Sequence, residues 1–163
     1  MDYARPATER IRKKFKSRQT IPAPAAVVFP LLCPVREYDW VPEWDCKLVY
    51  TASGLAERDC VFQTERDADG GVDTWVICRH EPDHLVEFIR INHLRAIRYE
   101  IRLSSISEGS TTLVWSQIIT ALSDEGDQHV ARMREEDFVQ GIAKMEALLK
   151  NYLAGSSTEE NSS

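Results

Sequence analysis

The chain has 163 residues, of which 43% are hydrophobic and 28% charged, and its formal net charge is −6. These values are typical of a soluble globular protein, and the acidic balance argues against a nucleic-acid binder, which usually presents a basic face. No apolar run approaches the ~20 residues of a membrane-spanning helix, and the N-terminus lacks the apolar core of a secretory signal. We therefore expect one cytoplasmic domain with a real core.

The first twenty residues are basic and hold seven Lys or Arg against two acidic residues. The cations are Arg5, Arg10, Arg12, Lys13, Lys14, Lys16 and Arg18. We expect residues 1–8 to be an N-terminal extension and residues 9–21 to form a first strand. In this strand Ile11 and Phe15 turn inward and the cations lie on the solvated face. The alternative is that the basic run contacts an anionic surface.

Two short helices are expected after the first strand. Pro24 suits the first turn of a helix, because the N–H that proline lacks would have no helical partner there. Residues 25–32 are apolar nearly all round, which is typical of a helix buried on more than one side. A second helical turn over residues 35–44 carries Trp40 and Trp44.

From residue 47 the hydrophobic period changes to two. Runs rich in Val, Ile, Thr and aromatic residues alternate with turn signals such as Asp69-Gly70-Gly71. Regularly spaced strands with short turns are typical of an antiparallel meander, and with the first strand they make seven. The predicted strands are 47–52, 60–66, 74–80, 85–93, 96–106 and 111–123.

A long helix is expected to close the domain. Residues 124–127 break the last strand and cap a helix, and helical spacing of apolar residues continues from 128 to about 154. The apolar face consists of Phe138, Ile142, Met145, Leu149 and Tyr152. Gly155 predicts the end of the helix, and residues 155–163, which include no apolar side chain, predict a disordered tail.

This order of elements resembles the helix-grip fold of the START-related superfamily, which includes plant pollen-allergen proteins, polyketide cyclases and lipid transfer domains. The resemblance covers residues 9–154, and its local features are residues 21–29, IPAPAAVVF, and Gly126-Asp127 before the last helix. It implies an α+β fold in which a curved seven-stranded antiparallel sheet surrounds the C-terminal helix, with a cavity between them. It implies no catalytic residue, because the family has no universal ones.

Strands that mix polar and aromatic residues supply the candidate ligand-binding residues. An apolar pocket with a few polar anchors is typical of small-molecule sites. The predicted pocket residues are Trp40, Trp44, Trp75, Phe88, Tyr99 and Trp115, and the predicted anchors are Arg79 and Arg90. The alternative is that the aromatic rings fill the core and that both arginines lie on the convex, solvated face.

Strand alternation assigns Trp75, Ile77 and Arg79 to one face. In residues 113–120 the odd-numbered and even-numbered sets compete for the inward face, and the sequence does not decide between them. Residues 37–44, in which carboxylates surround two tryptophans, are the expected mouth of a cavity. The alternative for these tryptophans is that they hold the short helices against the sheet.

No motif for metal, cofactor or covalent chemistry is found in the sequence. His80 and His84 flank a turn at Pro82 and have no evident third ligand, so no metal is expected. The four cysteines form no C-x-x-C pair and predict reduced, mostly buried thiols. No G-x-S-x-G elbow and no phosphate-binding loop occur, so neither a catalytic residue nor a cofactor is predicted.

Three functions remain open at this point. The leading hypothesis is a non-enzymatic protein that binds or carries a small hydrophobic or aromatic molecule in an internal cavity. The second is a cyclase, dehydratase or hydrolase acting on a polyketide-like or lipid substrate, which needs a buried ionisable group. The third is a protein-interaction or chaperone-regulating module with a closed interior. An edge strand also offers a route to a homodimer.

Overall fold

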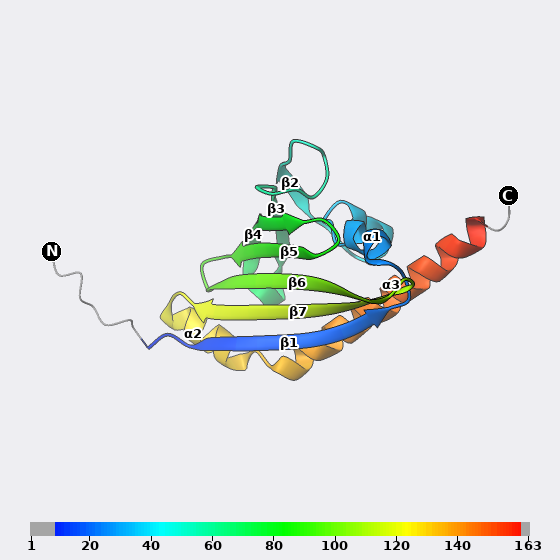
Figure 1. Cartoon of the computed structure of the whole chain (residues 1–163). Helices are drawn as coiled ribbons and strands as arrows, with labels where there is room; N and C mark the ends of the chain where they lie inside the picture. The colour runs from blue at the N-terminus through cyan, green and yellow to red at the C-terminus, as the bar shows by residue number, and fades with distance from the viewer. Residues whose placement is uncertain (1–8, 161–163) are drawn as a thin grey trace.

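A curved antiparallel sheet with two helices behind it makes up the fold (Figure 1). The computed structural model describes residues 9–160, and their side chains as far as residue 156. The strand order is β1-β7-β6-β5-β4-β3-β2, so β1 lies beside the last strand of a meander. The strands are β1 (Arg12–Ile21), β2 (Lys47–Tyr50), β3 (Val61–Arg66), β4 (Gly71–Glu81), β5 (Leu85–Ile91), β6 (Arg95–Ser107) and β7 (Ser110–Ala121). The predicted α+β helix-grip fold is confirmed.

The alternation of buried and half-buried residues along β7 shows which face of the sheet is turned toward the core. Leu113, Trp115 and Gln117 are buried, whereas the residues between them are only half-buried. The odd-numbered set of residues 113–120 therefore faces inward, which the sequence left undecided. The inward face is the concave one, against which the C-terminal helix packs.

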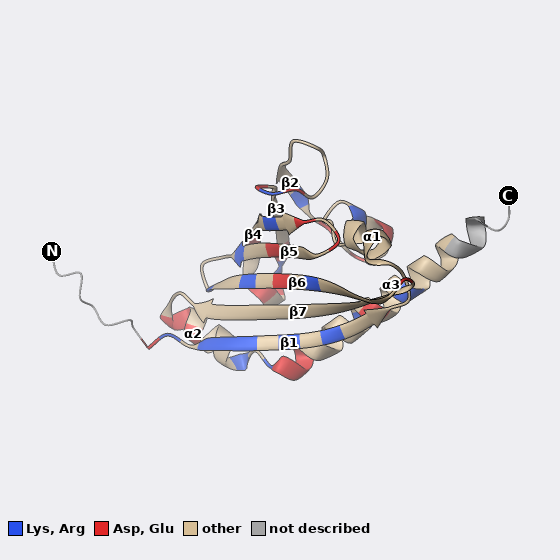
Figure 2. Ribbon diagram, in the orientation of Figure 1, with Lys and Arg blue, Asp and Glu red and all other residues tan. Residues whose placement is uncertain are grey.

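Strand β1 is amphipathic in the way that its pattern predicts. Phe15, Gln19 and Ile21 are buried, and the intervening cations are exposed. Figure 2 shows these Lys and Arg residues as blue segments along β1, at the edge of the sheet. The exposed cations are Arg12, Lys14, Lys16 and Arg18. The predicted extension, residues 1–8, lies outside the described residues.

The short helical segments after β1 pack over one end of the sheet, and we call them the plug. They are α1 (Ala25–Val28), η1 (Phe29–Leu31) and η2 (Arg36–Asp39), where η denotes a 3₁₀-helix. Val28 is fully buried and belongs to the main core cluster, as the apolar pattern of this segment predicts.

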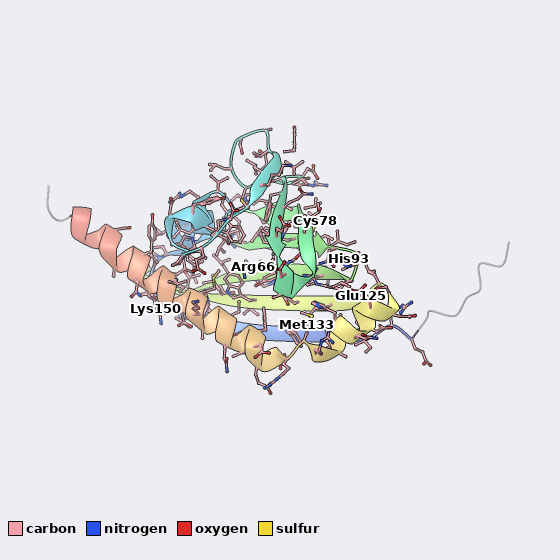
Figure 3. The ribbon with its side chains drawn as sticks, turned by 180° about the vertical axis from the view of Figure 1, so that it is seen from behind. Arg66, Cys78, His93, Glu125, Met133 and Lys150 are labelled. Atoms are coloured by element: carbon pink, nitrogen blue, oxygen red, sulfur yellow. The ribbon has the colours of Figure 1, made fainter. Side chains whose placement is uncertain are left out.

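The predicted single helix over residues 128–154 is wrong, because the structure has two helices, α2 (Asp124–Arg132) and α3 (Glu135–Glu160). They meet at Met133, which has ψ 132° and is labelled in Figure 3. The Nζ of Lys13 donates to the carbonyls of Ala131 and Met133, at 2.9 and 2.6 Å. This lysine satisfies carbonyls at the end of α2 and ties the break to β1.

The boundaries of the helical region also differ from the expectation. Helix α2 begins after Ser123, whose Oγ accepts a hydrogen bond from the Gly126 backbone at 3.0 Å. Helix α3 continues through Gly155 to Glu160, so the predicted stop at Gly155 is wrong. Residues 161–163 of the predicted tail lie outside the described residues. No helix in the described part of the chain is long and apolar enough to cross a membrane.

Candidate functional site

The space between the concave face of the sheet and α3 is filled mainly by apolar side chains; we call it the helix–sheet layer. On α3, Ile142 and Leu149 are buried in the core. Phe138, Met145 and Tyr152 face the same cluster but stay partly accessible. Solvent therefore reaches part of the apolar surface that α3 turns toward the sheet.

Aromatic rings from the central strands meet in this layer. Trp75 stacks on Phe62 with ring centroids 5.3 Å apart, and Phe88 meets Trp75 edge-on at 5.7 Å. Tyr99 lies edge-on to Trp115 at 6.0 Å. We call these five residues the aromatic cluster. The structure thus brings together four of the predicted pocket residues, Trp75, Phe88, Tyr99 and Trp115.

The other two predicted pocket residues lie in the plug. Trp40 is buried, and its Nε1 donates to the carbonyl of Leu31 at 2.9 Å. Trp44 is half-buried, and its Nε1 donates to the carbonyl of Pro34 at 2.8 Å. Both indoles hold the segment around η2 together, which fits the packing alternative. Trp44 keeps an accessible side next to the main core cluster.

Arg79 does not face the helix–sheet layer. The pairing of β4 with β5 shifts between Ile77 and Arg79, so that Cys78 is an extra residue at a β-bulge. Arg79 is therefore turned out of the face that holds Ile77; it is exposed and pairs with Glu81 at 2.6 Å. The expectation that Arg79 shares the face of Trp75 is wrong, because the bulge reverses the alternation. His80 takes the inward position, with its ring 5.2 Å from that of Phe29.

Arg90, the second predicted anchor, does lie beside the aromatic cluster. Its guanidinium carbon stands 4.5 Å from the ring centroid of Trp75. Its Nε donates to Asp73 at 2.7 Å and its Nη2 to Asp69 at 2.5 Å. The guanidinium thus has two carboxylate partners within the protein.

Asp73 is the centre of a buried ion network that sequence reasoning missed. It receives two hydrogen bonds from Arg95, at 2.6 and 3.0 Å, and both side chains are almost completely buried. Burial alone would raise the pKa of Asp73, but hydrogen bonds and charges from Arg95 and Arg90 outweigh it and lower that pKa. No local signal reveals the pair, because its members are 22 positions apart.

Glu37, on η2, has the opposite environment. Burial raises the pKa of its carboxyl to about 8, and no hydrogen bond or ion pair of that carboxyl is found among the described residues. The side chain is nevertheless partly accessible. The sequence placed Glu37 at the mouth of a cavity but not among the ligand-binding residues.

Tyr99 connects Glu37 to the aromatic cluster. Burial raises the pKa of its hydroxyl strongly; the charge of Arg90 opposes this shift, and the charge of Glu37 adds to it. A hydrogen bond with Gln117 also acts on the hydroxyl. The charges of Glu37 and Arg90 therefore both act on the Tyr99 hydroxyl, with opposite effects on its pKa.

Three further buried polar atoms have no partner among the described residues. They are the Nε1 of Trp115, the Oε1 of Gln19 and the Nε of Arg95, whose two Nη atoms bind Asp73. Gln19 uses its Nε2 to donate to the carbonyl of Ile142 on α3, at 3.2 Å. Unpaired buried polar atoms are rare, since each costs about 1–3 kcal/mol. Together with Glu37 they are unpaired polar groups in surroundings that are otherwise mainly apolar.

Two hollows are open to the surface. One, of about 310 Å³, lies on the outer face of the sheet between Arg12 and Arg98. The other, of about 130 Å³, lies beside β2 and β3 near Cys46. Neither of these two hollows lies under α3. Within the described residues, no group of three or more His, Cys, Asp or Glu side chains is arranged to hold a metal ion. All four cysteines are free thiols.

No protein-family model and no curated protein sequence matches this chain. Solved structures do match it. Major latex-like protein 151 from Panax ginseng is similar with a TM-score of 0.66 and 12% identity, over 87% of this chain and 97% of that one. Norcoclaurine synthase from Thalictrum flavum, in complex with dopamine and hydroxybenzaldehyde, has a TM-score of 0.65 and 9% identity, over 90% of this chain and 88% of that one.

A third similar structure is DynU16, a protein encoded in the dynemicin biosynthetic locus, with a TM-score of 0.58 and 15% identity. The match covers 86% of this chain, which spans about half the length of DynU16, 47%. Identities this low show the fold alone. The fold that these matches share with this chain is the predicted helix-grip fold.

Proposed function

We propose that this protein binds a small hydrophobic or aromatic molecule in the helix–sheet layer. The observation that carries the proposal is the Glu37 carboxyl, which is desolvated, partly accessible and without a partner among the described residues. Such a group costs stability, and its charge acts on Tyr99 of the aromatic cluster, so we infer that a bound molecule supplies the missing contact.

Apolar contact would provide most of the affinity. Burial of apolar surface contributes roughly 25 cal/mol per Å², and the edge-on arrangement of Phe88 and Tyr99 suits the insertion of a further ring. Met145 and Tyr152 on α3 and Trp44 in the plug would cover the molecule from the other side, since each packs against the main core cluster and is only partly buried.

Polar contacts would orient the molecule. Glu37, the hydroxyl of Tyr99 and the amide of Gln117 are the groups best placed for this role. Arg90 supports the site indirectly, because its guanidinium is engaged by Asp69 and Asp73 and braces Trp75. Arg79 is not part of the proposed site.

The test uses the neutral fluorescent probe N-phenyl-1-naphthylamine. The wild-type protein is expected to enhance the probe's fluorescence and to unfold at a higher temperature with it, since a ligand at about 100 times its Kd adds roughly 2.7 kcal/mol. Met145→Trp fills the layer and is expected to abolish both effects. The matched control is Val139→Trp, because Val139 lies on the same helix and is 40% exposed. Equal binding by the two variants would contradict the proposal.

A second proposal is acid–base catalysis by Glu37 on the bound molecule. A pKa of about 8 lets one carboxyl both hold and release a proton near neutral pH, which is what general acid–base catalysis requires. If a compound found with the probe is turned over, its rate is expected to follow an ionisation near pH 8 that Glu37→Gln removes. An identical pH profile in that variant would exclude this role.

A further inference from the structure

The outer face of the sheet carries a row of cations along β1. Arg12, Lys14, Lys16 and Arg18 occupy successive outward positions and are all exposed. Outward positions in a strand repeat every second residue, so the four cations extend over about 20 Å. None of the four side chains has an ion-pair partner within the part of the chain that the structure describes. The carboxylate of Glu135 accepts a hydrogen bond from the backbone N–H of Lys16 at 3.2 Å, but it pairs with none of the four side chains. The row therefore carries four unpaired cations on a protein whose net charge is −6.

The neighbouring strand, β7, carries only uncharged side chains on its outward side. Lys14 pairs with Ile118 of β7, which pairs in turn with Arg98 of β6, so an isoleucine lies between two cations. Lys16 and Arg18 pair with Ser116 and Val114. This side of β7 therefore carries hydroxyl and aliphatic groups only.

A hollow spans β7 between the row on β1 and Arg98 on β6. It is the hollow of about 310 Å³ described above; Arg12 and Arg98 line it together with Ile89, Ala96 and Ile118. Arg98 is exposed and, like the row, has no ion-pair partner among the described residues. The hollow thus combines two free guanidinium groups with an apolar lining.

No helix covers this side of the sheet. Helices α2 and α3 lie behind the sheet in Figure 1 and in front of it in the reversed view of Figure 3. The blue segments on β1 in Figure 2 consequently lie open on the uncovered side. We call the side chains Arg12, Lys14, Lys16, Arg18 and Arg98 the outer basic face.

We propose that the outer basic face docks the protein on a bilayer that contains anionic phospholipids. The cations are complementary to phosphate-bearing headgroups, and the aliphatic side chains between them suit the boundary between headgroups and acyl chains. A stripe along one strand can also lie against a flat surface although the sheet is curved.

Nucleic acid fits this surface less well. Single strands are held by aromatic side chains on which bases stack, and the outward side of β1, β7 and β6 presents none. A duplex requires basic side chains spread over a broad face, but on β6 the acidic Glu100 follows Arg98 at the next outward position. Docking on a bilayer is independent of what the helix–sheet layer holds.

The test is co-sedimentation of the full chain with vesicles of phosphatidylcholine alone or mixed with phosphatidylserine. Binding is expected only to the mixed vesicles and is expected to fall as salt screens the charges. Each cation near an anionic bilayer contributes roughly a fivefold gain in affinity, so Lys14→Glu/Arg98→Glu is expected to bind at least about 25-fold more weakly.

The matched control is Arg66→Glu/Lys144→Glu, which changes net charge equally at two exposed positions away from the outer basic face. It is expected to lose less than about fivefold. Thermal unfolding of both variants should match the wild type, because all four residues are exposed. Equal losses in the two variants would overturn the proposal, as would binding to polyglutamate or inorganic phosphate without binding to mixed vesicles.

Discussion

Two carboxyl groups that are desolvated by burial, Asp73 and Glu37, have opposite environments. Asp73 is held by Arg95 and Arg90, and its pKa is lowered in spite of burial. Glu37 has no such partner among the described residues, and burial raises its pKa to about 8. The charge of Asp73 is therefore neutralised by partners within the protein, whereas the charge of Glu37 is not. The first closes one end of the layer, and the second marks the proposed site.

Breaking the satisfied network should have the largest effect. Asp73→Asn leaves Arg95 buried without a carboxylate and is expected to lower the free energy of unfolding by about 3–5 kcal/mol, as measured by urea denaturation. Asp69→Asn is the control, because the Asp69 carboxylate is partly exposed and, among the described residues, pairs with Arg90 alone; its cost is expected to be about 1 kcal/mol. Equal losses would show that the network is not the structural element we describe.

Removing the Glu37 carboxyl should raise the free energy of unfolding instead of lowering it, and the gain should depend on pH. The pKa of Glu37 is raised on folding, so its contribution to stability is complete below about pH 4.5 and is lost as pH rises through about 8. Glu37→Gln removes this loss. At pH 8–9 the variant is expected to be more stable than the wild type by on the order of 4 kcal/mol, and at pH 4 equally stable.

The measurement is urea unfolding of both proteins across this pH range. Asp73, whose pKa is lowered, contributes stability that is lost instead as pH falls, so it acts equally in both proteins and cancels in the difference. A stability difference that does not change with pH would contradict the environment described for Glu37.

The close packing at the Asp73 end can be tested at Gly126. A Cβ there would overlap the carbonyl oxygen of Leu94, so Gly126→Ala is expected to cost about 1–3 kcal/mol. Gly141→Ala on α3 has open space around the new methyl group and is expected to stabilise by about 0.5–1 kcal/mol. If thermal unfolding ranks the two variants in the reverse order, α2 does not pack against the sheet as described.

The smallest effect is expected from Arg79. Its ion pair with Glu81 is exposed, so Arg79→Ala should change stability by less than about 1 kcal/mol and leave probe binding intact. Arg90→Ala removes a partner of Asp73 and the cation over Trp75, and should weaken both stability and probe binding. Loss of binding in Arg79→Ala would show that the bulge does not separate the two arginines functionally.

The strands could be predicted because each one repeats its chemistry every second residue. β6, for example, alternates apolar residues with Arg98, Glu100 and Arg102, and the paired strands supply matching faces. The position of Arg79 could not be predicted in this way. A single extra residue at Cys78 reverses the alternation, and nothing in the local sequence marks it.

Features that depend on distant partners were also missed. The break between α2 and α3 lies within a continuous helical pattern, and it is held by Lys13 from the other end of the chain. Nothing in the sequence marks Asp73 and Arg95 as partners, because only the fold places them together. For Trp40 and Trp44 the sequence leaves a cavity mouth and packing both open, and it does not reveal their bonds to backbone carbonyls.

The most direct test of the account is an NMR experiment on the protein with bound N-phenyl-1-naphthylamine. If the molecule lies in the helix–sheet layer, its protons should show nuclear Overhauser effects to the ring of Tyr99 and the methyl group of Met145. Effects to Ile89 and Ile118 on the outer face instead, with none to Tyr99 or Met145, would contradict the central claim.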